Sequence, residues 1–350
     1  MPITFLIDYK REKILSFNLT SKLGKSIQPP NAMPKAEGNI LMENIGRSRF
    51  FSSSTKIDNR PILQLNALPM TLSPKTYENA HSSINPNGSF TSLYAFSQLA
   101  NSIPSFSEYY SDSLNTVSSV YGNLLHGSSV GNDEKYTESV ISSSLKTYES
   151  SDFSNMDGIP DSWYPVYATP VDWYDTSDPE RFSEITLDLI GEETDDGPYR
   201  VLKGGTNILS SLTQSGSGLS VPIDQGTSLK SIKLKYLEVR LNRPWLSFEV
   251  FNLGGWFIEG QNSGYFSSGS FDINPGVIPL ITTSMLVAID VELAAEWSMK
   301  DQQAIDEAKR KGKRISVGPF VAHLEPDSEP ELHVIGWVSQ LVPLSPQIED

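Results

Sequence analysis

Hydrophobic residues recur at intervals of three and four within residues 105–151, which is the spacing of one face of an α-helix. The first stripe comprises Tyr110, Leu114, Val117, Tyr121, Leu124 and Leu125, and the second comprises Tyr136, Val140, Ile141, Leu145 and Tyr148. Gly127 and Gly131 separate the two stripes, and Asn132 followed by Asp133 and Glu134 is typical of a helix start. The pattern predicts a helical hairpin within residues 91–152.

The other faces of this hairpin carry Ser and Thr rather than Lys and Glu. An outer face of low charge indicates that something covers it, either the rest of the fold or a second subunit. Insertion of the hairpin into a membrane is the alternative.

Beyond Pro160 the pattern changes to the two-residue period of β-strands. Residues 183–190, 198–202, 231–241 and 284–293 alternate or are rich in β-branched side chains between turn residues. In the last of these segments one face is apolar throughout, and the other becomes polar at Asp290 and Glu292. One short helix is predicted near 299–312, with Ser298 as its N-cap and Gly312 as its stop.

These segments predict an α+β protein in which the helical hairpin packs on a β-rich, sandwich-like C-terminal domain. We expect three parts: an irregular N-terminal arm with short strands (1–90), the hairpin (91–152) and the β-rich domain with its one short helix (153–350). Residues 21–50 are rich in Pro, Gly, Asn and Lys without any period, which favours irregular chain.

The net charge of −15 opposes binding to phosphate backbones, so nucleic acid is excluded as a general partner. Residues 1–60 run against this trend, with ten Lys or Arg and five Asp or Glu. A basic first segment can dock on the acidic remainder of its own chain or of another copy. We therefore predict a homo-oligomer formed through the N-terminal arm or the helical hairpin.

The chain has no Cys, which excludes disulfides, thiolate catalysis and sulfur-ligated metal sites. The first apolar run is too short for a classical signal peptide. The longest apolar stretch, 277–289, is interrupted by polar residues and is shorter than the ~20 residues that a membrane-spanning helix needs. We expect a soluble protein whose compartment is unassigned.

Residues 157–175 concentrate two of the six Trp and three of the fourteen Tyr. Planar rings flanked by carboxylates are typical of sugar-binding surfaces, and equally of a well-packed core. A Gly-rich region, 253–276, adds further aromatic residues at predicted turns. The candidate ligand-binding residues are Trp163, Tyr164, Tyr167, Trp173, Tyr174, Trp256 and Tyr265.

Residues 153–164 resemble the calcium loops of thrombospondin type 3 and dockerin-like repeats, which have the pattern D-x-D-x-D-G-I-P-D. The resemblance implies Ca²⁺ ligands at Asn155, Asp157 and Asp161, with a sharp turn at Gly158. Phe153 and Tyr164 depart from the pattern, because they stand where its first and last ligands belong. A plain Gly-Pro turn is the alternative.

The C-terminal segment 315–341 is predicted to form a β-hairpin with its turn at 326–330. In a register centred on Ser328, His323 lies opposite His333 and Glu325 opposite Glu331, all on one face. Two imidazoles and two carboxylates suit Zn²⁺ or another first-row ion. A one-residue slip would separate the set, and the alternative is a solvated acidic tip.

The chain contains no G-x-S-x-G, Walker, dinucleotide-binding or zincin motif, and it has only four His. The leading hypothesis is therefore a non-enzymatic binding or assembly protein that contacts a protein or a glycan through its aromatic and Gly-rich surfaces. A secreted toxin or effector acting on membranes through the hairpin is the first alternative, and a metal-assisted hydrolase is the second. No cofactor is expected other than Ca²⁺ or Zn²⁺ at the sites above.

Overall fold

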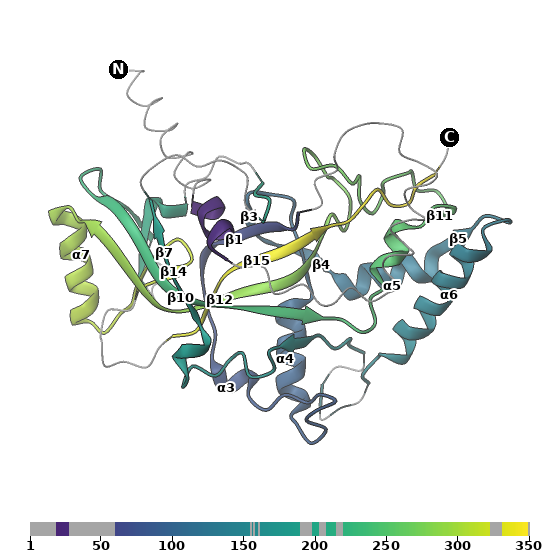
Figure 1. Cartoon of the computed structure of the whole chain (residues 1–350), viewed down its shortest axis with the longest axis horizontal. Coiled ribbons are helices and arrows are strands. Elements are labelled where there is room, and N and C mark those ends of the chain that lie inside the picture. The colour runs from purple at the N-terminus through teal and green to yellow at the C-terminus, as the bar shows by residue number, and fades with distance from the viewer. Residues whose placement is uncertain are drawn as a thin grey trace, which may run out of the picture.

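The centre of the fold is a β-sheet. Helices cover one of its faces, and a further helix and a smaller sheet cover the other. The structure, a computed structural model, describes residues 19–27, 60–154, 156, 158–159, 162–189, 198–202, 208–214, 220–322 and 331–348. Within these residues the central sheet has seven strands in the order β3-β1-β15-β12-β10-β6, and β7 pairs with β10 next to β6 (Figure 1). The strands are β1 (Ile62–Thr71), β3 (Tyr109–Tyr110), β6 (Tyr167–Thr169), β7 (Ser183–Asp188), β10 (Ser228–Asn242), β12 (Leu280–Glu296) and β15 (His333–Leu341). β1 and β3 are parallel, and the other pairs are antiparallel.

Hydrophobic residues cover both faces of β12, the longest strand described. Met285, Val287 and Ile289 face one core, whereas Leu286 and Ala288 face another. The end of the strand is polar and exposed at Glu292, as its sequence predicts. The alternation is broken at Asp290, where a bulge moves Val291 to the face that carries Leu286.

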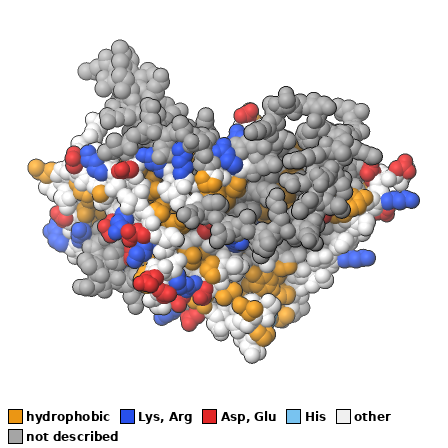
Figure 2. Space-filling view, in the orientation of Figure 1, with side chains coloured by type: hydrophobic (Ala, Val, Ile, Leu, Met, Phe, Trp, Pro, Cys, Tyr) orange, Lys and Arg blue, Asp and Glu red, His pale blue; other side chains and the backbone are white. Residues whose placement is uncertain are grey.

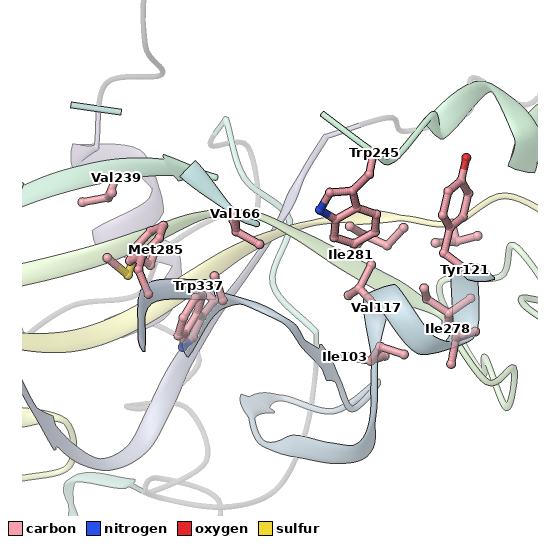
Figure 3. Close-up of a cluster of buried hydrophobic side chains, with 14 of the residues drawn as sticks. Ile103, Val117, Tyr121, Val166, Val239, Trp245, Ile278, Ile281, Met285 and Trp337 are labelled. Carbon is pink, nitrogen blue, oxygen red and sulfur yellow. The ribbon is translucent and has the colours of Figure 1, made fainter. Parts of the chain in front are cut away.

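One face of the sheet is covered by helices. These are α3 (Pro74–Tyr77), α4 (Phe90–Ala100), α5 (Val117–Gly127) and α6 (Lys135–Ser150). Figure 3 shows Val117 and Tyr121 of α5 close to Trp245 and Ile278, with Met285 of β12 and Trp337 of β15 farther along the same cluster. This core joins residues from both sides of position 152.

The opposite face is covered by a helix at 19–26 and a second, four-stranded sheet in the order β14-β13-β8-β9. Its strands are β8 (Ser211–Gln214), β9 (Ser220–Pro222), β13 (Ile315–Val317) and β14 (Phe320–Val321). Leu19 and Leu23 of the helix and Phe320 of β14 are buried with Leu234 of β10 and Leu286 of β12. The sequence prediction placed residues 1–90 in an irregular arm, but the described part contains this helix and the long strand β1.

Smaller elements complete the described fold. They are β2 (Ser102–Pro104), β4 (Asp112–Thr116), β5 (Ser128–Val130), β11 (Trp256–Ile258), α7 (Met299–Arg310) and the 3₁₀ helices η1 (Pro179–Arg181), η2 (Ile208–Ser210) and η3 (Phe248–Asn252). α7 confirms the predicted helix. The Ser298 side chain accepts a hydrogen bond from the Asp301 amide, and Gly312 has the positive φ of a helix stop. The mixed α and β composition, richer in strand than in helix, is also as predicted.

The first predicted helical stripe is wrong in its N-terminal half. Tyr110 lies in β3 and Leu114 lies fully exposed in β4, so only the residues from Val117 onward form a helix. The Thr116 side chain accepts a hydrogen bond from the Ser119 amide. This cap places the first residue of the helix at Val117. The outer face of α6, with Ser142 and Ser143, is exposed in the single chain rather than covered.

The predicted C-terminal hairpin is also wrong. β13 and β14 pair with each other and belong to the small sheet, whereas β15 lies in the central sheet between β1 and β12. His333 therefore lies opposite Thr71 on one side and Ala288 on the other, so both hydrogen-bonding edges of β15 are already paired at this residue. β1 and β12, which are far from β15 in sequence, pair with its two edges, where a local hairpin partner would have paired.

Candidate functional site

Two tryptophans of the aromatic segment pack on different sides of α4. Trp163 meets Tyr94 with 5.3 Å between ring centroids, and it is buried with Leu93. Trp173 meets Phe96 at 5.4 Å and belongs to the core between α4 and the sheet. The segment between the two tryptophans therefore wraps α4, which explains the repeated Trp-Tyr pairs as a packing feature.

The tryptophans that the sequence analysis gave as candidate ligand-binding residues lie in the interior. Trp163 is 4% exposed, Trp173 is 2% exposed and Trp256 is 1% exposed. Their rings fill hydrophobic clusters and do not offer a free face to a ligand at the surface. Burial is the ordinary position of such large side chains, and it was the competing interpretation.

A series of half-exposed rings surrounds Trp163. His81 stacks on Phe90 at 4.1 Å, Phe90 meets the edge of Phe153 at 5.7 Å, and Phe153 meets Trp163 at 5.1 Å. We call the aromatic surface the partly exposed side chains of His81, Phe90, Tyr94, Phe153 and Tyr167 together with Ile84, which is 74% exposed. Hydrophobic side chains gather at the end of the molecule that carries α4 (Figure 2).

The loop that forms one side of the aromatic surface is closed by hydrogen bonds at its ends. The Phe153 amide donates to the Trp163 carbonyl oxygen at 2.9 Å, and the Trp163 amide donates to the Asp152 carboxylate at 3.2 Å. Gly158 has φ of +79°, so the sharp turn predicted there is confirmed. The implied Ca²⁺ ligands Asn155, Asp157 and Asp161 lie outside the described residues, and calcium binding stays a prediction.

The remaining tyrosines of the aromatic segment make internal contacts. Tyr164 stacks on Tyr148 of α6 at 4.1 Å, and burial raises the pKa of both hydroxyls. The Tyr174 hydroxyl accepts a hydrogen bond from the Asn79 amide at 3.1 Å. Each ring keeps part of its area exposed, but these contacts hold it in position.

The Gly-rich region is a set of tight turns fastened to the C-terminal segment. The Ser345 hydroxyl donates to the Phe251 carbonyl oxygen, and the Phe266 amide donates to the Ser345 carbonyl oxygen, at 2.7 and 2.8 Å respectively. Ser267 and Asn274 are buried and hydrogen-bonded to each other in the same place. This region holds two of the candidate ligand-binding residues, Trp256 and Tyr265. Only Tyr265 reaches the surface, at 38% exposure.

The structure describes two of the four candidate metal ligands in the C-terminal segment, Glu331 and His333. His333 is buried at the start of β15, and its Nδ1 lies 3.1 Å from the Glu331 carbonyl oxygen. Glu331 forms an ion pair with Arg314. His323 and Glu325 lie outside the described residues, and within the described part no three or more His, Asp or Glu side chains group as a metal site.

Sequence reasoning missed most of the aromatic surface. His81 and Ile84 come from a turn with no hydrophobic period, and Phe90 and Tyr94 from a helix that was not predicted as such. The segment 90–100 carries a signal that could have revealed that helix, because Ser89 is an N-cap residue followed by apolar residues spaced three and four apart. His81 and Phe90 come together with Phe153 only through tertiary packing.

No helix in the described ranges combines the length and the apolar character that crossing a membrane requires. No protein-family model, curated protein or solved structure matches this chain.

Proposed function

We propose that this chain is a non-enzymatic assembly protein whose aromatic surface binds a second copy of the chain. The observation that carries the proposal is the aromatic surface itself: half-exposed rings that contact one another and Trp163, on the same part of the chain as the exposed Ile84, which follows His81 in the turn before α4. Contiguous apolar surface of this kind is typical of contact sites.

Charge restricts where a second copy can bind. Each chain carries a net charge of −15, so two copies repel each other except where they meet through surface of low charge. The aromatic surface contains no Lys, Arg, Asp or Glu. A two-fold symmetric dimer presents the same patch from both partners, and an apolar patch is complementary to itself.

The packing of the rings favours a protein partner over a glycan. Sugar recognition uses ring faces that stand open, but His81 and Phe90 stack their faces on each other. Phe153 and Tyr94 each meet Trp163 nearly edge to face. What reaches solvent is a mixture of ring edges and aliphatic side chains, which suits the packed core of a protein interface.

The membrane-acting alternative receives less support from the helices. Val117, Tyr121 and Leu124 of α5 are buried in the core between the helices and the sheet. Releasing them would expose that core to water, at a cost of about 1.5–3 kcal/mol for each large apolar side chain.

The test is the mass of the purified chain by light scattering after size exclusion, across a range of concentrations. We expect a dimer in the unmodified protein and a monomer in Ile84→Glu, because each copy would then bury an unpaired carboxylate in the interface. Met299→Glu is the matched control, since Met299 is 80% exposed on α7, far from α4, and its variant should remain dimeric (Figure 1).

A monomer at every concentration would contradict the proposal, and so would a dimer that both variants leave intact. A glycan array run on the same samples would move the assignment to sugar binding if ligands appear and Ile84→Glu abolishes them.

A further inference from the structure

His81 is the member of the aromatic surface whose charge changes near neutral pH. The other side chains of this surface are those of Ile, Phe and Tyr. An imidazole gains a positive charge as pH falls between 8 and 5, whereas phenol hydroxyls stay neutral in that range. Each copy of the aromatic surface therefore carries one group that changes it from uncharged to cationic as pH falls.

Contacts on two sides hold this imidazole within the aromatic surface. Its ring stacks on Phe90, with 4.1 Å between centroids and 22° between planes, and it meets the edge of Phe153 at 6.4 Å. Its Nδ1 lies 3.1 Å from the Pro86 carbonyl oxygen, so in the neutral ring Nδ1 carries the proton and Nε2 has the lone pair. Protonation at Nε2 therefore charges a ring that is fixed among aromatic side chains.

The elements around His81 supply few groups that could pair with its charged form. On α4, β6, the turn 78–89 and the loop 151–164, the other titratable side chains described are Glu78, Tyr94, Asp152, Tyr164 and Tyr167. The Asp152 carboxylate already accepts a hydrogen bond from the Trp163 amide at 3.2 Å. Asp157 and Asp161 of the same loop lie outside the described residues. Within the described part of the chain, no carboxylate forms an ion pair with His81.

We propose that protonation of His81 dissociates the dimer formed through the aromatic surface, so that assembly is lost as pH falls. This inference rests on the function proposed above. Burial of an imidazole in an apolar interface disfavours its charged form, so assembly and protonation oppose each other. The net charge of −15 acts in the opposite direction, because it shrinks as pH falls and the two copies then repel each other less. Dissociation in mild acid therefore has to come from a group within the contact.

The test is the dimer dissociation constant of the full chain at pH 7.5 and at pH 5.5, measured by sedimentation equilibrium at equal ionic strength. We expect the constant to be about tenfold higher, or more, at pH 5.5. The readout is the ratio of the two constants within each protein, because a substitution in the contact also changes the dimer at both pH values. His81→Phe keeps a ring to stack on Phe90 and takes up no proton, so its ratio should fall to about one.

The other described histidines provide the controls. His126 is exposed on α5, and His126→Gln should keep the pH ratio of the unmodified chain. Burial lowers the pKa of His333 to about 4, so this imidazole stays neutral at both pH values. A pH ratio that is lost in His126→Gln would assign the effect to α5 and overturn the inference.

The outcomes separate this inference from the proposed function. A dimer with the same dissociation constant at both pH values overturns the inference and leaves the proposed function standing, whereas a monomer at both overturns the proposed function and the inference with it. A pH dependence that His81→Phe retains overturns the inference alone, and so does unfolding of the chain at pH 5.5, which circular dichroism detects. If His81→Phe does not form a dimer, His81→Gln decides, because its uncharged amide can still donate to the Pro86 carbonyl oxygen.

Discussion

Asp290 carries a backbone conformation that few residues other than Gly adopt. Its φ is +52°, within the left-handed region, in the middle of β12. Two residues, Asp290 and Val291, stand opposite Leu234 alone, and this bulge moves Val291 into the core that contains Leu286. The Asp290 carboxylate lies 3.1 Å from the Lys235 ammonium, which adds an ion pair across the bulge.

Substitutions at Asp290 should separate backbone strain from the ion pair. Asp290→Asn keeps a residue that tolerates positive φ and removes a partly exposed ion pair, so we expect a loss of less than about 1 kcal/mol. Asp290→Val places a β-branched residue there and should cost about 1–3 kcal/mol. Urea unfolding measures both, and equal stability of the two variants would contradict a strained bulge.

Glu238 on β10 is a partly buried carboxyl whose pKa is raised. Removal of the side chain from water is the main cause, and hydrogen bonds from Ser284 and Tyr199 together with the nearby Arg240 oppose it. The folded chain therefore binds this proton more tightly than the unfolded chain does. The stability that Glu238 contributes is present below its unfolded pKa and is lost as pH rises through the folded pKa.

Glu238→Gln should raise Tm at pH 7, because the amide keeps the shape of the side chain and has no charge to desolvate. The gain should shrink as pH falls toward the ordinary Glu value near 4.5. Thermal unfolding of both proteins from pH 4 to pH 8 measures this, with Glu184→Gln, an exposed carboxyl on β7, as the control. A Glu238→Gln variant that is less stable at pH 7 would mean that its hydrogen bonds outweigh desolvation.

At the scale of elements, the Gly-rich turns are shaped by close contact between backbones. A Cβ placed on Gly276 would lie 2.2 Å from the Phe266 carbonyl oxygen, nearer than any real contact allows. The same segment is fastened to the C-terminal residues around Ser345 by backbone hydrogen bonds. Gly276 thus serves the close packing of this turn against Phe266.

Gly276→Ala should destabilise the protein by about 1–3 kcal/mol, because the backbone at residue 276 and the backbone at Phe266 and Ser267 must move apart. The matched control is Gly254→Ala in the same region, where a Cβ meets nothing within 4 Å, and it should stay within about 0.5 kcal/mol of the unmodified chain. Hydrogen exchange at the Phe266 and Ser267 amides locates the loss. Protection that is unchanged in Gly276→Ala would contradict this view of the turn.

At the scale of the whole molecule, Arg243 joins the helical layer to the central sheet. Its guanidinium donates to the Ala100 carbonyl oxygen at the end of α4 at 2.6 Å, and to the Thr282 carbonyl oxygen of β12 at 2.5 Å. It also donates to the Thr282 hydroxyl at 2.8 Å. Burial lowers the pKa of Arg243 to about 10, which leaves it charged at neutral pH.

Arg243→Met should lower the free energy of unfolding by about 2 kcal/mol or more. The variant leaves two buried carbonyl oxygens without donors, at about 1–3 kcal/mol each, and regains only part of this from the desolvation of the cation. Arg310→Met, at an exposed position on α7, is the control and should be within about 0.5 kcal/mol of the unmodified chain. Should Arg243→Met be as stable as the unmodified chain, the desolvation cost of the guanidinium would equal the value of its three bonds.

The sequence alone determined the elements whose signals are local. α7 follows from Ser298 and Gly312, α6 from the period that includes Ile141 and Tyr148, and β10 and β12 from alternation and β-branched residues. These signals are reliable because a cap or a period needs only residues within a few positions of each other. The exclusions based on charge and the absence of Cys also need nothing more than the chain itself.

Only the tertiary structure decided how distant segments meet. β15 pairs with β1, where Ser339 lies opposite Ile62, and no local pattern announces a partner so far along the chain. The same holds for the burial of Trp163 and Trp173, the convergence of Phe90 and Phe153, and the isolation of His333 Nε2. A local pattern records which side of an element is apolar, whereas the identity of its neighbour depends on which packing of all the elements buries the most surface and leaves the fewest polar groups unpaired.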